Sequence, residues 1–178
     1  MNYTLTDTLG IDVAIQNVQT KLYTLLKNRW ANKDIDGYGR VHDVNEVPRW
    51  FNIDTKDYED VYLDDRISAN FSFIPSASSD TDDGYAFVND VKVVFIVNLE
   101  TLFIDGVGRQ DERAHRDALE ALRTIMRAGG ISEIDNVQVG IENVFRGFDQ
   151  SLIKLDDMHP YHIFAVNVVL PYSLKDKC

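Results

Sequence analysis

The segment NKDIDGYGRVHD, residues 32–43, carries oxygen-bearing side chains at the spacing of a calcium-binding loop. On a twelve-position loop, Asn32, Asp34 and Asp36 occupy the first, third and fifth positions, and Asp43 occupies the twelfth. Calcium prefers carboxylate and carbonyl oxygens as ligands. These four residues are therefore the candidate metal ligands of the chain.

The same segment departs from the calcium-loop pattern in several places. The first position is Asn rather than Asp, Gly39 stands where an apolar residue is usual, and Asp43 reaches less far than a bidentate Glu. Pro48 follows closely and leaves no room for the second helix of an EF-hand. The preferred interpretation is a turn in which Gly37 and Gly39 supply positive φ, and a calcium-binding interaction module is the alternative.

Other residues with catalytic potential do not form a recognisable constellation. His159 and His162 are three apart in a predicted strand, so their side chains should point to opposite faces. His115, near the start of a predicted helix, is expected to be exposed, and no Ser or Cys is placed to complete a relay with it. GVGRQDE at 106–112 lacks the third glycine of a dinucleotide fingerprint. We therefore expect no enzyme activity, no catalytic residue and no cofactor.

Composition limits the class of protein. The chain has 178 residues, of which 44% are hydrophobic, so we expect a single domain, 1–178, with one sizeable core. The formal net charge of -11 disfavours a surface that neutralises nucleic-acid phosphates. The chain has one cysteine, Cys178, which indicates a reducing compartment. No apolar run in the sequence is long enough to cross a membrane.

Hydrophobic periodicity predicts two helices and four strands around a long polar segment. The expected helices cover about 9–29 and 110–128, and the expected strands about 67–74, 90–99, 137–145 and 160–170. Residues 31–66 are polar and rich in turn-forming residues, so we expect an extended arm, and residues 75–90 read as a long inter-strand loop. The predicted fold class is α+β, with an antiparallel (mixed) sheet of about four to five strands packed by two α-helices.

The order of these elements resembles a known family. The stretch DGYGRVHDVNEVPRWFN leads into DYEDVYLDDRISANFSF, and the strand VKVVFIVNLETLF is followed by the helix DERAHRDALEALRTIMR and a closing pair of strands. This order and texture are similar to those of the tail-terminator and neck (head-tail connector) proteins of tailed bacteriophages.

The resemblance implies a structural virion protein, assembled in the host cytoplasm, that forms a homo-oligomeric ring of six or twelve copies. Such a ring joins portal or adaptor proteins to the tail, and DNA passes through its lumen without specific binding. The family has no catalytic residues to carry over to this chain. The long arm (31–66) or the long loop (75–90) would then contact the neighbouring subunit.

Overall fold

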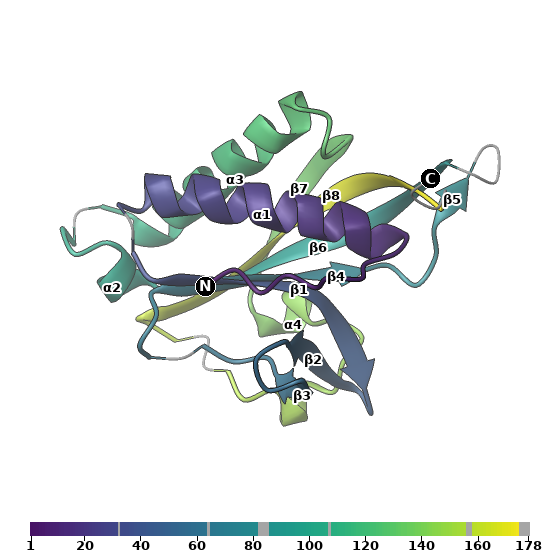
Figure 1. The fold of residues 1–178 in the computed structure, drawn as a ribbon. Helices are drawn as coiled ribbons and strands as arrows, with labels where there is room; N and C mark the ends of the chain where they lie inside the picture. Colours follow the sequence, from purple (N-terminus) through teal and green to yellow (C-terminus); the bar gives the residue numbers. More distant parts are fainter. Residues whose placement is uncertain (32, 64, 82–85, 107, 156–157, 175–178) are drawn as a thin grey trace.

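The computed structural model describes residues 1–174 except 32, 64, 82–85, 107 and 156–157, and these residues form one mixed sheet of eight strands (Figure 1). The strands are β1 (Ile35–Val44), β2 (Val47–Asn52), β3 (Asp57–Asp60), β4 (Ala69–Pro75), β5 (Asp80–Thr81), β6 (Ala86–Asn98), β7 (Glu133–Val139) and β8 (Tyr161–Ser173). Their spatial order is β3-β2-β1-β4-β6-β8-β7, with β5 paired to β6. Strands β1 and β4 are parallel, and the other pairs are antiparallel.

The described helices are α1 (Ile11–Arg29), α2 (Leu99–Leu102), α3 (Gln110–Arg127), α4 (Ile141–Val144) and the 3-10 turn η1 (Gln150–Leu152). Figure 1 shows the two long helices, α1 and α3, together on one face of the sheet, with β2, β3 and α4 beyond the other face. The predicted sheet of four to five strands packed by two helices is therefore wrong, because the described part of the chain has eight strands and four α-helices. The broader α+β class still applies.

Local sequence explains the two long helices. Along α1, buried Ile15, Val18, Leu22 and Leu26 recur at three- or four-residue steps and make one apolar stripe. Helix α3 has acids in its first turn and Arg127 in its last, an order that complements the helix dipole. It ends at a glycine pair, where Gly129 adopts a φ of 78°, a conformation that costs an L side chain steric energy.

The core lies on both faces of the β6–β8 pair. Alternation along β6 sends Val93 and Phe95 towards α1 and α3, while Val94 and Ile96 point the other way. We call these sides the helix face and the hairpin face. The hairpin face is covered by Trp50 of β2 and by residues from α4 onward, including Phe145.

The expected extended arm is mostly sheet. Within residues 31–66, β1 and β2 form an antiparallel hairpin and β3 pairs with β2, so the polar segment adds three strands to the edge of the sheet. The sequence gives a weak signal here because β1 carries two glycines and three charged residues, Asp36, Arg40 and Asp43. Pairing with the neighbouring strands stabilises a segment whose local pattern is poor.

The expected long loop at 75–90 is also more ordered than predicted in its described part. Residues Asp80–Thr81 form β5, and β6 already begins at Ala86. Buried Asn89 organises the turn: its Nδ2 donates to the carbonyl oxygens of Ser76 and Ser78, and its Oδ1 accepts from the Ser76 amide. One side chain thus replaces the backbone pairing that a short hairpin would supply.

A third difference concerns the strand expected at 137–145. Strand β7 covers Glu133–Val139, and Gly140 at a φ of 88° redirects the chain into α4. The apolar alternation therefore ends at Val139, and Val144 contributes to the hairpin-face core from a helix.

Candidate functional site

The described candidate calcium ligands lie at different places. Asp36 and Asp43 belong to the same strand, β1, seven residues apart, which corresponds to roughly 20 Å along a strand. Asp34 precedes this strand and lies 3.6 Å from Lys27 Nζ, while Asn32 lies outside the described residues. The structure therefore does not bring Asp34, Asp36 and Asp43 to one point.

Each of these carboxylates has another described contact. Asp36 contacts the N-terminal ammonium group, and Asp43 Oδ1 accepts a hydrogen bond of 2.8 Å from the Glu46 amide in the β1–β2 turn. The predicted turn at 32–43 is wrong for its described residues from Ile35 onward, because they form β1. Gly37 is required there for close approach: a Cβ atom would lie 2.7 Å from Phe71 Cζ.

A histidine pair joins α3 to the sheet on the helix face. His115 of α3 and His162 of β8 are 2.8 Å apart between their Nε2 atoms, and both rings contact Phe164. The side chain of His115 is only 14% exposed, so the expectation of an exposed histidine is wrong. Strand alternation was the sequence signal that could have placed His162 on the helix face, since His162 and Phe164 share one face of β8.

The surroundings of the pair disfavour protonation of His115 to its charged imidazolium form. Burial lowers the pKa of His115, and the adjacent His162 lowers it further, while Glu112 and Asp111 act in the opposite direction. The Arg109 guanidinium holds the pKa of Asp111 well below its usual range. One imidazole must donate and the other accept across the 2.8 Å contact, so the pair fixes α3 on β8 when it is neutral.

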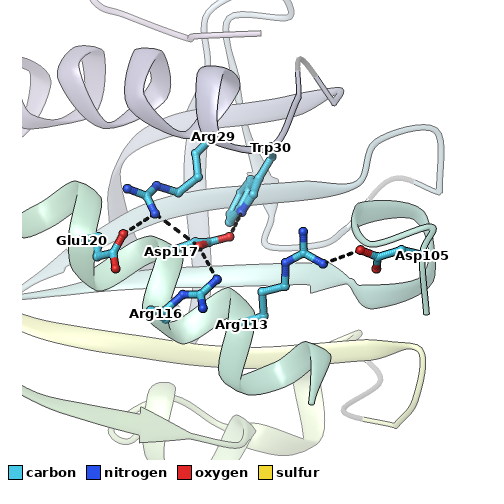
Figure 2. A network of polar contacts seen from close by, with 7 residues as sticks. All are labelled: Arg29, Trp30, Asp105, Arg113, Arg116, Asp117 and Glu120. Atoms are coloured by element: carbon cyan, nitrogen blue, oxygen red, sulfur yellow. Dashed lines mark hydrogen bonds and ion pairs between the residues drawn. The ribbon is translucent and has the colours of Figure 1, made fainter. Parts of the chain in front are cut away.

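A second polar cluster fixes α1 against α3 (Figure 2). Asp117, 4% exposed, accepts a hydrogen bond of 3.1 Å from the Trp30 indole and lies 3.4 Å from Arg29 Nη1. Arg29 also contacts Glu120 one turn later on α3. Sequence periodicity could not reveal this cluster, because Trp30 and Asp117 are 87 positions apart. Its effect is to hold the two helices together.

Exposed apolar side chains lie at both ends of the β6–β8 pair. At the end where Ala86 pairs with Ser173, Leu9 and Leu174 are 76% and 57% exposed beside a cavity of about 910 Å³. At the end where Asn98 pairs with Tyr161, the connections carry Ile104 and Met158, 77% and 75% exposed. Exposed apolar side chains contribute to contacts between proteins where they belong to a contiguous patch.

Other kinds of site find less support in the described residues. No group of three or more His, Cys, Asp or Glu side chains among them is arranged to hold a metal ion. No helix within the described part of the chain combines the length and hydrophobicity required to span a membrane.

Comparison with known proteins gives no relative from which a role could be transferred. The chain matches no known protein family and no curated protein.

Proposed function

We propose that this chain is a structural subunit of a ring at the head-tail junction of a tailed bacteriophage. In this proposal six or twelve copies join the portal or adaptor to the tail and surround the DNA channel of the virion. The subunit acts by binding its neighbours and carries out no reaction. The proposal is supported by the resemblance in element order and by the distribution of exposed apolar residues on the structure.

The observation that carries the proposal is the difference between the two ends of the β6–β8 pair. One end presents Leu9 and Leu174 next to a cavity, and the other presents Ile104 and Met158 on protruding connections. Unlike surfaces on one chain favour head-to-tail contacts between copies, and such contacts close into a ring when the rotation per copy allows it. A two-fold dimer would instead use the same surface twice.

The acidic surplus is compatible with a DNA channel in such a ring. The hairpin side exposes several acids, including Glu46, Asp54 and Asp57, in a chain with a net charge of -11. If this side faces the lumen, repulsion keeps the phosphate backbone from binding while DNA passes. The ring therefore guides DNA without holding it.

Native mass spectrometry of the full-length protein tests the proposal. We expect a discrete closed oligomer of six or twelve copies, with the same mass in chelator and in calcium, and ring-shaped particles in negative-stain images. A protein that stays monomeric up to millimolar concentration, or that forms only two-fold dimers, would contradict it.

A further inference from the structure

The histidine pair brings two imidazole nitrogens from distant parts of the chain to one point between α3 and β8. The Nε2 atoms of His115 and His162 are 2.8 Å apart, and both rings contact Phe164 on the helix face. In a neutral pair one Nε2 carries a proton and the other presents its lone pair. The nitrogens of neutral imidazole are also the commonest metal ligands in proteins. The same convergence can therefore hold a proton or a metal ion.

The other nitrogen of His115 faces a carboxylate. Its Nδ1 lies 4.0 Å from Oε2 of Glu112, which is three residues earlier on α3. A histidine that binds a metal through one nitrogen usually directs the other towards a carboxylate, a carbonyl oxygen or water, and this contact keeps the ligating nitrogen free of a proton. The position of Glu112 therefore favours the tautomer of His115 in which Nδ1 carries the proton and Nε2 presents its lone pair.

A cavity gives ions access to the pair. It has a volume of about 420 Å³, and His162 lines it together with Arg109, Asp111 and His159. Because the described residues contain no group of three or more His, Cys, Asp or Glu side chains arranged around one ion, a metal bound here takes two ligands from the protein. The cavity has room for the water molecules that fill the other positions of a tetrahedral ion.

The charged groups near the pair favour a cation on balance. Asp111 and Glu112 both stabilise positive charge on His115, whereas Arg109 opposes it. Arg109 Nη2 lies 2.8 Å from Asp111 Oδ2, so this arginine largely offsets one of the two acids and leaves a surplus of one negative charge. The third histidine of the region, His159, has its Nδ1 3.9 Å from a different carboxylate, that of Glu100.

We infer that His115 and His162 bind one divalent transition-metal ion through their Nε2 atoms, and that Zn²⁺ is the ion that fits best. Zinc accepts imidazole nitrogen and a tetrahedral arrangement, whereas calcium prefers oxygen ligands. Zn–N bonds of about 2.0–2.1 Å place two tetrahedral ligands roughly 3.3 Å apart, so the pair opens by about half an ångström. The Nε2 proton moves to Nδ1 of the same ring, and a neutral pair releases no proton. The ion joins α3 to β8 in each copy, whether or not copies assemble into a ring.

Calorimetric titration with ZnCl₂ tests the site. The full-length protein is used without a polyhistidine tag and with Cys178→Ser, since a thiol is itself a zinc ligand. We expect saturable binding of one Zn²⁺ per chain at pH 7.5. Zn²⁺ should also raise the melting temperature, because only the folded chain brings the two imidazoles together, and Ca²⁺ should not. Absence of saturable binding would overturn the inference.

Substitutions identify the ligands. His115→Gln and His162→Gln should each raise the dissociation constant for Zn²⁺ by at least about tenfold, because each removes one of two protein ligands. His159→Gln is the matched control, since His159 lines the same cavity but contacts Glu100, and it should leave the affinity unchanged. Equal losses in all three variants would place the ion at the mouth of the cavity and overturn the inference. Circular dichroism establishes that each variant is folded.

Imidazole NMR spectra provide a test that needs no substitution of a histidine. The chain has four histidines, so His42 and His159 serve as internal references. Zn²⁺ at one equivalent should shift the ring nitrogen resonances of His115 and His162 and leave those of His42 and His159 in place. Shifts of all four in proportion to added zinc, or of neither His115 nor His162, would overturn the inference.

Discussion

The two faces of the sheet are covered by different kinds of structure. The helix face is covered by two long helices, α1 and α3, whose apolar stripes are local features of the sequence. The hairpin face is covered by short pieces, among them β2, β3 and α4, that come from distant parts of the chain. Both faces nevertheless bury large side chains completely, for example Phe95 and Phe145.

The comparison shows that a well-packed layer does not require long, regular elements. A helix stripe forms a cover from one segment, because its apolar residues recur every turn. The hairpin face instead depends on pairings such as β1 with β4 and on contacts that close long loops, so it orders only when the rest of the sheet exists. Substitutions on the two faces can test whether both layers contribute equally to stability.

The largest expected difference in unfolding free energy is between the substitutions of two acids, Asp117 on the helix face and Asp60 on the hairpin side of the sheet. Asp117→Ala should lower the free energy of unfolding by about 2–3 kcal/mol, because the buried Trp30 indole loses its acceptor and Arg29 loses a partner. Asp60→Ala, which removes the half-exposed contacts to Arg49 and Lys154, should cost about 0.5–1 kcal/mol.

Urea unfolding at pH 7 measures both values. Glu120→Ala is the control for Asp117, since it removes an exposed partner of the same arginine and should cost less than about 1 kcal/mol. Equal losses for Asp117→Ala and Asp60→Ala would show that burial of the α1–α3 cluster contributes nothing beyond a surface ion pair.

Two adjacent valines give a closely matched comparison. Val93 and Val94 are both fully buried in β6 and point to the helix face and the hairpin face, respectively. Each change to alanine should lower the free energy of unfolding by about 1–2.5 kcal/mol, because each deletes two buried carbons and leaves a cavity. A much smaller loss for Val94→Ala in chemical denaturation would indicate that the hairpin-face layer is loosely packed.

The histidine pair predicts that the stability of the protein depends on pH. Because the folded-state pKa of His115 is lowered, protonation favours the unfolded chain, and stability should fall as the pH decreases below about 6.5, the ordinary pKa of histidine. Above that pH this group should have no effect. His115→Gln should reduce the difference in unfolding free energy between pH 7.5 and pH 5. An unchanged difference would argue against this role, and His159→Gln on the surface is the control.

The smallest expected effect is that of calcium. Since Asp34, Asp36 and Asp43 do not converge, we expect calcium to leave the melting temperature unchanged relative to chelator. A rise in melting temperature that disappears in Asp34→Ala plus Asp36→Ala would restore the calcium-binding alternative. It would also show that ligand binding, rather than strand pairing alone, stabilises β1 and its neighbours.

Prediction from the sequence succeeded where structure is local. The expected helices at about 9–29 and 110–128 lie within two residues of α1 and α3 at either end. The strands expected at about 67–74, 90–99 and 160–170 overlap β4, β6 and β8, whose alternating or continuous apolar residues are visible in one segment. The two polar clusters could not be predicted from the sequence, because neither the His115–His162 contact nor the Asp117–Trp30 contact joins residues close in sequence.

The sequence by itself determined the charge of the protein, its two amphipathic helices and its most apolar strands, because composition and periodicity act over a few residues. Tertiary structure alone decided that residues 35–60 add β1, β2 and β3 to the sheet, since β1 becomes a strand by pairing with distant β4. It also decided that Leu9 and Leu174 lie at one end of the β6–β8 pair and Ile104 and Met158 at the other, because the distance between exposed residues is a property of the folded chain.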